Sequence, residues 1–253
     1  MLDKIDIEDI KYIAVKSGNA VLNIYNQDFD VEYKDDNSPV TKADLEANRI
    51  ILEGLTKLYL DIPILSEETD LVDYEIRKHW EYYWCIDPLD GTKEFVKRNG
   101  EFTINIGLIH KGNPVLGVVF APMLNELYYA KKGYGAFKNG YELPFIINDT
   151  PKEYISVASS RSHKSDKAQK FIDNLRNETE ELIIFEQGSS LKFCLLAEGM
   201  IDIYPRFSQI QEWDTAASHC ILLESGKNIL NYETGKQITY NKKSMLQPWF
   251  IAK

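Results

Sequence analysis

Cysteine is scarce in this sequence of 253 residues, and its three copies stand far apart. They are Cys85, Cys194 and Cys220, they form no CxxC pair, and apolar residues flank each of them. We therefore expect buried free thiols and no disulfide framework. An odd number of cysteines without such a framework is typical of a reducing compartment.

Long apolar runs are also absent. The first residues, from Met1 to Asp6, alternate charged and apolar side chains and do not form the apolar centre of a signal peptide. No run approaches the ~20 apolar residues that a membrane-spanning helix needs. We expect a cytoplasmic protein with no integral membrane segment, whose association with a membrane is at most peripheral, at the inner face.

Basic residues are fewer than acidic ones. There are 29 Lys and Arg against 39 Asp and Glu, which gives a formal net charge of −10. Such a charge repels nucleic acids and anionic lipids over a Debye length, so no nucleic-acid partner is expected. If the substrate is a phosphate, bound divalent cations are the obvious way to reverse the field locally.

Several motifs for other chemistries are missing. The P-loop pattern GxxxxGK[ST] does not occur, and the glycines at Gly133 and Gly135 do not extend to GxGxxG. Zinc is not expected, because HxxxH and HExxH spacings are absent around the four histidines, which are His79, His110, His163 and His219.

What the sequence does contain is the composition of a globular protein, with 44% hydrophobic and 27% charged residues. A chain of this length buries roughly 70–75% of its unfolded surface, which is enough for a sizeable core. No linker-like segment interrupts it. We expect one compact α+β unit of two packed halves, residues 1–150 and 151–253.

The first half is predicted to contain two helices followed by a sheet. Apolar residues recur at helical spacing over residues 1–25 and 42–59, and Thr41 is a plausible N-cap of the second helix. Short turns separate the strands that follow, so we expect an antiparallel sheet. Its predicted strands cover residues 82–86, 103–109, 115–120 and 126–130, with an Asn-Gly hairpin at 138–140.

The second half alternates strands and helices, which favours a mixed or parallel sheet. The predicted strands cover residues 154–158, 182–185 and 201–204, and the predicted helices cover 166–176, 190–198 and 213–224.

The densest chemical feature lies at residues 84–92, where an apolar strand ends in Asp87 and Asp90. Pro88 keeps Asp87 extended, and the two carboxylates are close enough in sequence to share a cation. Gly91 can take a positive φ, and Thr92 offers a hydroxyl and an N–H where a helix begins, which suits a phosphate. The alternative is an ordinary surface turn.

Further acidic groups stand at the ends of other elements. Glu67 and Glu68 follow an apolar run and are either solvated surface or hard oxygen ligands. Asp214 opens an apolar helix and is either a metal ligand or a helix N-cap. Asp44 lies in the first turn of the second helix, where it either belongs to a capped helix start or accepts a hydrogen bond within the site. Together these groups suffice for two or three Mg²⁺ ions.

The order of these segments resembles the inositol monophosphatase superfamily. The matching motifs are Ser-Pro-Val-Thr-x-Ala-Asp, Leu-Ser-Glu-Glu, Asp-Pro-Leu-Asp-Gly-Thr-Lys-Glu-Phe, Gly-Glu-Phe-Thr-x-Asn-Ile, Gly-Ser-Ser-Leu-Lys-Phe-Cys and Trp-Asp-Thr-Ala-Ala. They run from Ser38 to beyond Asp214 and so cover most of the chain. The stretches 160–163 and 188–194 resemble the CysQ-type branch of 3′(2′),5′-bisphosphate nucleotidases. The resemblance implies a layered α/β/α/β/α sandwich.

The resemblance also implies residue roles. Thr92, hydrogen-bonded to Asp44, orients or deprotonates the attacking water, with help from Glu67 and Glu68. The implied Mg²⁺ ligands are Glu67, Asp87, the Leu89 carbonyl, Asp90 and Asp214. The substrate contacts comprise these ligands except Asp87, the phosphate-holding Gly91 and Thr92, and the nucleotide-facing His163, Ser189, Lys192 and Arg206. The chain departs from many relatives after Arg206, where it has Phe-Ser-Gln-Ile instead of Phe-Gly-Pro-Thr.

We therefore expect a Mg²⁺-dependent, lithium-sensitive phosphatase. The preferred substrate is adenosine 3′,5′-bisphosphate, which yields AMP and phosphate, and 3′-phosphoadenosine 5′-phosphosulfate is a further candidate. Two alternatives stay open: an inositol or sugar phosphate phosphatase with the same metal centre, and a non-catalytic phosphate- or metal-binding protein. The sequence does not indicate an oligomeric state.

Overall fold

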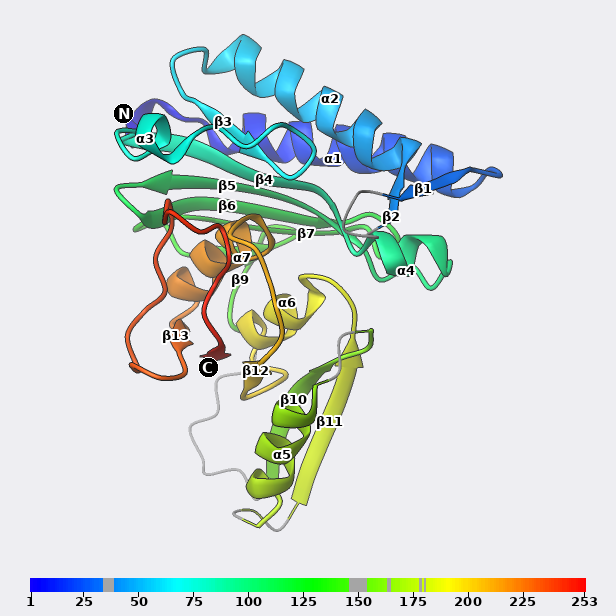
Figure 1. Cartoon of the computed structure of the whole chain (residues 1–253), viewed down its shortest axis with the longest axis vertical. Helices are drawn as coiled ribbons and strands as arrows, with labels where there is room; N and C mark the ends of the chain where they lie inside the picture. Colours follow the sequence, from blue (N-terminus) through cyan, green and yellow to red (C-terminus); the bar gives the residue numbers. More distant parts are fainter. Residues whose placement is uncertain (34–38, 146–153, 163–164, 178, 180) are drawn as a thin grey trace.

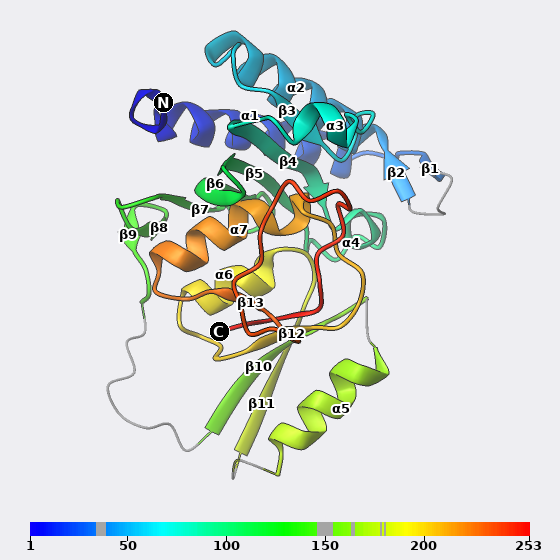
Figure 2. The ribbon, with the colours of Figure 1, turned by 60° about the vertical axis from the view of Figure 1, so that its left-hand side comes forward.

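Five layers follow one another along the long axis of the molecule (Figures 1 and 2). They are two helices, a large sheet, two further helices, a group of smaller strands and one outer helix. The computed structural model describes the chain except for residues 34–38, 146–153, 163–164, 178 and 180. The layer order confirms the expected α/β/α/β/α sandwich.

The first layer consists of α1 (Ile7–Tyr25) and α2 (Lys42–Leu58). α2 is near its predicted bounds, whereas α1 starts later than predicted, because the side chain of Asp6 accepts from the Glu8 N–H and caps it. Ile10, Ile13 and Val21 of α1 are buried against the sheet, as their helical spacing requires. The prediction of Thr41 as the N-cap of α2 is confirmed. Its hydroxyl accepts from the Ala43 N–H, and a capping box with the side chain of Asp44 completes the helix start.

The large sheet has seven strands in the order β3-β4-β5-β6-β7-β8-β9. Neighbouring strands are antiparallel except for β3 and β4, which run parallel. The four predicted strands are therefore antiparallel as expected, and the parallel edge strand β3 was not predicted. The connection from β3 to β4 contains the short helix α3 (Tyr74–Arg77), which allows the chain to return in the same direction. The strands are β3 (Ile64–Ser66), β4 (Tyr82–Asp90), β5 (Thr103–His110), β6 (Asn113–Ala121), β7 (Glu126–Lys131), β8 (Ala136–Lys138) and β9 (Tyr141–Glu142).

The opposite face of this sheet is covered by α7 (Trp213–Glu224), whose bounds match the prediction, with α6 (Leu191–Ala197) beside it (Figure 2). α7 can lie close to β6 because Gly117 has no side chain. A Cβ at Gly117 would lie 2.1 Å from the carbonyl oxygen of Ala217. The sheet is therefore buried on both faces, which explains the nearly continuous apolar runs of β5 and β6.

The smaller strands form the expected mixed arrangement. β10 (Tyr154–Ser160) pairs parallel with β11 (Glu181–Gln187), whereas β12 (Tyr204–Arg206), β14 (Phe250–Ala252) and β13 (Ile229–Asn231) are antiparallel. A single parallel bridge between Val157 and Ile203 joins the two groups. The strand predicted at 201–204 was misplaced, because the Asp202 carboxylate accepts from the Ser156 N–H and a regular strand starts only at Tyr204.

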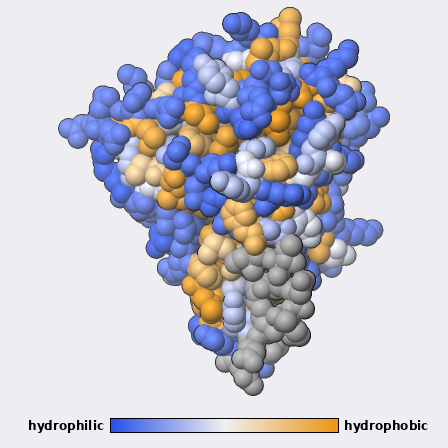
Figure 3. All heavy atoms as spheres, turned by 180° about the vertical axis from the view of Figure 1, so that it is seen from behind, coloured by the Kyte–Doolittle hydropathy of each residue, from blue (hydrophilic) through white to orange (hydrophobic). Residues whose placement is uncertain are grey.

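We call β10, α5 (Asp166–Leu175) and β11 the outer unit. It projects from the rest of the molecule (Figure 1). The space-filling view from behind likewise shows that the molecule is narrower at this end (Figure 3). Its own core is small and contains the buried residues Val157, Ile172 and Leu175.

The remaining short elements are the 3-10 helix Leu2–Lys4, β1 (Val31–Tyr33), β2 (Pro39–Thr41) and α4 (Thr92–Val96). All three cysteines are buried and free, as expected. The predicted boundary near residue 150 lies outside the described residues. Among the described residues, no helix is both long and apolar enough to cross a membrane.

Candidate metal centre and substrate pocket

The end of β4 is bulged where it carries its two aspartates. Asp87 pairs with Asn105 and Asp90 pairs with Thr103, so β4 advances three residues while β5 advances two. Pro88 lies in this interval and has no N–H for the ladder. Residues three apart in a regular strand point to opposite faces, and the bulge changes that alternation. Both aspartates consequently border the same pocket.

Gly91 and Thr92 lie directly after the bulge. Gly91 has φ +95° and precedes α4, and a Cβ there would lie 2.9 Å from the carbonyl oxygen of Glu101. A side chain at this position would therefore meet both an unfavourable backbone conformation and a close neighbour. The turn brings the Thr92 hydroxyl to the pocket, where it donates to Asp44 Oδ1 at 2.8 Å and lies 3.3 Å from the Leu89 carbonyl oxygen.

Asp44 connects the helix layer to this turn. Its Oδ2 atom accepts from the N–H and the hydroxyl of Thr41, both at 2.7 Å, while Oδ1 accepts from Thr92. The side chain is only 1% exposed. Burial raises the pKa of this carboxyl group, and the hydrogen bonds from Thr41 and Thr92 oppose that shift. Asp44 therefore completes the capping box of α2 and also accepts a hydrogen bond from the pocket residue Thr92.

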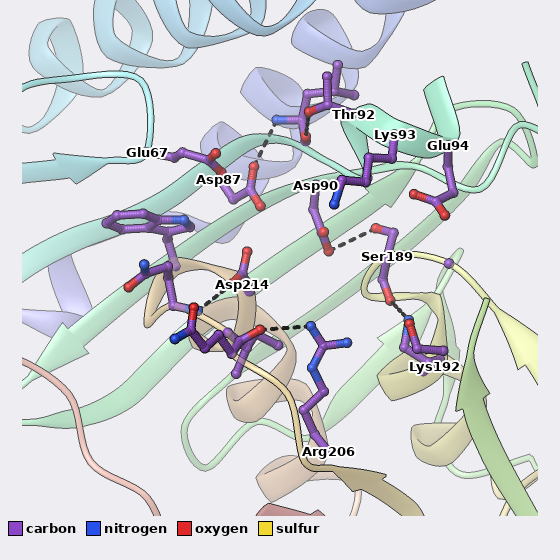
Figure 4. Close-up of a pocket in the computed structure, with 18 of the residues that line it drawn as sticks. Glu67, Asp87, Asp90, Thr92, Lys93, Glu94, Ser189, Lys192, Arg206 and Asp214 are labelled. Atoms are coloured by element: carbon purple, nitrogen blue, oxygen red, sulfur yellow. Dashed lines mark hydrogen bonds between the residues drawn. The ribbon is translucent and has the colours of Figure 1, made fainter. Parts of the chain in front are cut away.

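Three carboxylates converge from three different elements. Glu67 follows β3, Asp87 lies in β4 and Asp214 lies in the first turn of α7, and one oxygen from each falls within 4.8 Å of the others (Figure 4). Glu212, not Asp214, occupies the N-cap position of α7, although Asp214 accepts from the Gln211 N–H at 2.6 Å.

The electrostatics of this cluster favour a bound cation. Burial raises the pKa of Asp87 well above its usual value, and the nearby charges of Glu67 and Asp90 raise it further. Burial, followed by the charge of Asp90, raises the pKa of Asp214 to about 7. Asp87 Oδ2 is buried and has no hydrogen-bond partner among the described residues. An unpartnered carboxylate oxygen among other carboxylates fits a hard divalent cation, which prefers oxygen ligands.

Asp90 lies beside this cluster but makes a different set of contacts. Its Oδ2 atom accepts from the hydroxyl groups of Ser189 and Ser190 at 2.9 and 2.8 Å, and Asn105 Nδ2 lies 3.4 Å away. These bonds connect the end of β4 to the turn between β11 and α6.

Two buried cations lie on the other side of the pocket. Lys192 is 3% exposed and donates to the carbonyl oxygens of Gln187 and Ser189, and burial lowers its pKa to about 8 with a further contribution from the charge of Arg206. Arg206 is 8% exposed and donates to the Gln209 carbonyl oxygen at 3.0 Å. The unusual loop after Arg206 thus holds the guanidinium group at the pocket wall, where Figure 4 shows it opposite the carboxylate cluster.

A single pocket of about 490 Å³ brings together most of the predicted site residues. Glu68 and Asp44 are not among its lining residues, and His163 lies outside the described residues. The predicted residues that line the pocket are Glu67, Asp87, Leu89, Asp90, Gly91, Thr92, Ser189, Lys192, Arg206 and Asp214.

The sequence analysis assigned no role to several polar residues that orient the site. Ser190 and Asn105 both contact Asp90, and the hydroxyl of Thr103 lies 2.7 Å from that of Ser189. A signal was present in β5, where Thr103 and Asn105 stand two residues apart in an otherwise apolar strand and so point to one face.

Comparison with known proteins gives the class. The model of the inositol monophosphatase family matches residues 1–249, and the chain therefore belongs to this family. The chain is also 45% identical over 249 residues to the 3′(2′),5′-bisphosphate nucleotidase CysQ of Salmonella typhimurium, covering 96% of this chain and 98% of that protein.

Solved structures agree with this assignment. The crystal structure of CysQ from Bacteroides thetaiotaomicron superimposes with a TM-score of 0.83 at 37% identity, covering 95% of this chain and 94% of that one. The inositol monophosphatase (IMPase) of Thermotoga maritima gives a TM-score of 0.80 at 28% identity, covering 97% of this chain and 91% of that one.

Proposed function

We propose that this protein is a Mg²⁺-dependent 3′(2′),5′-bisphosphate nucleotidase that hydrolyses adenosine 3′,5′-bisphosphate to AMP and phosphate. The observation that carries the proposal is the full-length similarity, at 45% identity, to the 3′(2′),5′-bisphosphate nucleotidase CysQ. The pocket supports it, because carboxylates gather on one side while Lys192 and Arg206 lie on the other (Figure 4). A substrate with two phosphate groups matches that division.

The carboxylate cluster would hold the metal. Glu67, Asp87 and Asp214 supply the converging oxygens, and Asp90 and the Leu89 carbonyl stand next to them as further ligands for two or three ions. When bound, Mg²⁺ neutralises charge on the phosphoryl oxygens and lowers the pKa of water.

Asp44 and Thr92 would orient the attacking water. Because the Thr92 hydroxyl donates its hydrogen bond to Asp44, the hydroxyl oxygen can accept a hydrogen bond from water. That hydrogen bond directs a water lone pair at phosphorus, and the proton that the water loses passes toward Thr92 and Asp44, with Glu67 and Glu68 as neighbouring acceptors. Gly91 and the first N–H groups of α4 would hold the phosphoryl group in place.

The opposite wall would bind the remainder of the nucleotide. Lys192 and Arg206 are cations whose burial strengthens their attraction for a second phosphate group. Ser189 and His163 would contact the nucleoside. A smaller substrate such as inositol monophosphate would use the metal side alone, and the similarity to the IMPase from Thermotoga maritima makes it the second candidate.

The test is phosphate release from a panel of esters with purified protein and Mg²⁺. We expect the ratio kcat/KM to be higher for adenosine 3′,5′-bisphosphate than for inositol monophosphate, and activity to be reduced by millimolar Li⁺. Preference for inositol monophosphate would reject the nucleotidase assignment. Failure to hydrolyse every ester, with the Asp90→Asn variant indistinguishable from the unaltered protein, would instead indicate a binding protein.

A further inference from the structure

The outer unit reaches the first half of the molecule near the pocket through an ion pair. Arg161, which follows β10, donates from Nε and Nη2 to the two carboxylate oxygens of Glu101 at 2.8 and 2.7 Å. The Nη2 atom also donates to the Glu186 carbonyl oxygen, so Arg161 is fixed to the end of β11 as well. Two parallel hydrogen bonds between a guanidinium group and a carboxylate fix the orientation of both side chains, whereas a single hydrogen bond does not.

Glu101 lies at the junction of three segments that form the pocket. Its carboxylate also accepts from the Gly188 N–H at 2.8 Å. The carbonyl oxygen of Glu101 packs tightly against Gly91 and Gly188. A Cβ added to Gly91 or to Gly188 would be only 2.9 or 3.0 Å from this oxygen. The backbone of Glu101 thus lies between the turn after β4 and the turn after β11. Its side chain is hydrogen-bonded to the turn after β11 through Gly188.

The turn after β11 carries a non-glycine residue in a left-handed conformation. Ser189 has φ +51°, which is costly for such a residue and requires support from its surroundings. Its hydroxyl donates to Asp90 at 2.9 Å and lies 2.7 Å from that of Thr103. The hydrogen bond from Gly188 to Glu101 comes immediately before this residue and so helps to hold it in place.

We propose that Glu101 is a positioning residue for the nucleotide side of the pocket, acting through Arg161 and Gly188. It sets where the outer unit and Ser189 stand relative to the carboxylate cluster, and so determines how well the second half of a nucleotide substrate fits. Glu101 is not among the residues that line the pocket. This inference rests on the proposed nucleotidase function.

A second contact should keep the outer unit folded and attached when the ion pair is removed. Ser162 accepts from Lys97 at 2.9 Å and donates to Glu94, and neither bond involves Arg161. Substitution of Arg161 should therefore shift the outer unit without unfolding it.

The experiment compares Arg161→Gln with Arg176→Gln in the full-length protein with Mg²⁺. Arg176, directly after α5, pairs with Asp173, so its replacement removes a cation from the same part of the molecule without touching Glu101. Each variant is assayed with adenosine 3′,5′-bisphosphate and with p-nitrophenyl phosphate, which has no nucleoside and no second phosphate. Glu101→Gln and Arg161→Lys complete the set, since the first keeps an acceptor for Gly188 and the second keeps the charge without the fork.

For Arg161→Gln we expect KM for the nucleotide to rise about tenfold, as expected for loss of a charge-assisted bidentate contact, with kcat changed less than about twofold. The rate with p-nitrophenyl phosphate and the Mg²⁺-induced rise in melting temperature should not change. Arg161→Lys should recover part of the loss, and Arg176→Gln should behave as the unaltered protein.

Two results would overturn the inference while leaving the nucleotidase assignment intact. One is an equal loss with both substrates, which indicates a general structural role, and the other is identical behaviour of Arg161→Gln and Arg176→Gln. The unaltered protein is assayed first, so an absence of nucleotide hydrolysis there rejects the proposed function itself, and this inference with it.

Discussion

The carboxyl group of Asp87 lies inside a strand, 1% exposed, among other carboxylates and with one unpartnered oxygen. Without a cation this arrangement is destabilising, because burial and like charges both oppose ionisation. Asp87→Asn should therefore melt at the same or a higher temperature than the unaltered protein in EDTA, and should lose most of the rise in melting temperature caused by Mg²⁺.

Thermal unfolding followed by fluorescence measures both effects. Asp70→Asn is the matched control, since Asp70 is exposed and does not line the pocket. A variant at Asp87 that retained the full Mg²⁺ response would place the cation elsewhere.

The hydroxyl of Thr92 makes a prediction about rate rather than binding. Thr92→Val keeps the shape of the side chain but removes the bond to Asp44. We expect kcat to fall by about 10²–10⁴, as for the loss of a proton-transfer group, with the Mg²⁺ response retained. Thr92→Ser should keep most of the activity. Steady-state kinetics decide the point, and a valine variant with near-normal kcat would exclude this hydroxyl from the reaction.

His219 is fully buried in α7, and its pKa is lowered to about 4 by burial. Nδ1 lies 2.9 Å from the Tyr240 hydroxyl and Nε2 lies 3.0 Å from Asn228 Oδ1, and the Asn228 contact opposes the effect of burial on this pKa. Because the unfolded chain titrates near pH 6.5, it binds more protons than the folded chain between about pH 6.5 and 4. His219 therefore lowers stability as the pH falls through that range.

Chemical denaturation at pH 7 and pH 5 tests this effect. His219→Gln should lose about 2 kcal/mol less stability between the two values than the unaltered protein, at ~1.4 kcal/mol per pH unit below 6.5. His79→Gln is the control, because His79 is exposed. The same pH dependence in all three proteins would contradict the assignment.

At the scale of elements, the contact between α7 and the large sheet depends on glycine. A methyl group at Gly117 would lie 2.1 Å from the backbone oxygen of Ala217, which cannot move without shifting the helix. Gly117→Ala should lower the free energy of unfolding by about 3 kcal/mol, at the upper end of overpacking effects. Asp214 belongs to the same helix, so Mg²⁺ affinity should fall in parallel.

Gly54→Ala in α2 gives a matched comparison. Its new Cβ would meet side-chain atoms of Ile13 rather than backbone, with Cδ1 and Cγ1 both at 2.8 Å, and alanine favours a helix. Denaturant unfolding should show a much smaller loss of unfolding free energy for Gly54→Ala than for Gly117→Ala. An equal loss in both variants would contradict the claim that the contact between α7 and the sheet depends on Gly117.

Most elements could be predicted because their causes are local. The bounds of α2 and α7 follow from apolar spacing, with the Thr41 cap at the start of α2, and these patterns are visible in the residues themselves. The parallel pairing of β3 could not be predicted, because strand direction depends on partners that are distant in sequence. β4 was ended too early at residue 86, since Asp-Pro at its end is typical of a turn and the bulge that accommodates it is tertiary.

The candidate site was likewise predictable only in part. The motifs indicated which residues gather in the pocket, and ten of the predicted residues line it. They did not indicate what holds them, because the contacts of Ser190 and Asn105 with Asp90 join segments that only the fold brings together.

For the whole molecule, the distribution of buried residues predicts uneven stability. The two large clusters lie on the faces of the seven-stranded sheet, whereas the separate core of the outer unit contains only three buried residues among those described. Amide hydrogens of β10 and β11 should exchange faster than those of β5 and β6 in the protein without substrate. Hydrogen exchange followed by mass spectrometry measures this difference, and equal protection throughout would show that the outer unit unfolds only with the rest.

The carboxylate cluster has a consequence for how the protein is made. Glu67 and Asp87 are synthesised early, but Asp214 enters the cluster only after α7 has emerged and packed against the sheet. A ribosome-bound or truncated chain that stops before α7 would lack this ligand. Completion of the cluster would therefore come late, after most of the chain has been synthesised and α7 has folded against the sheet, so that a chain stopped before α7 would have an incomplete site.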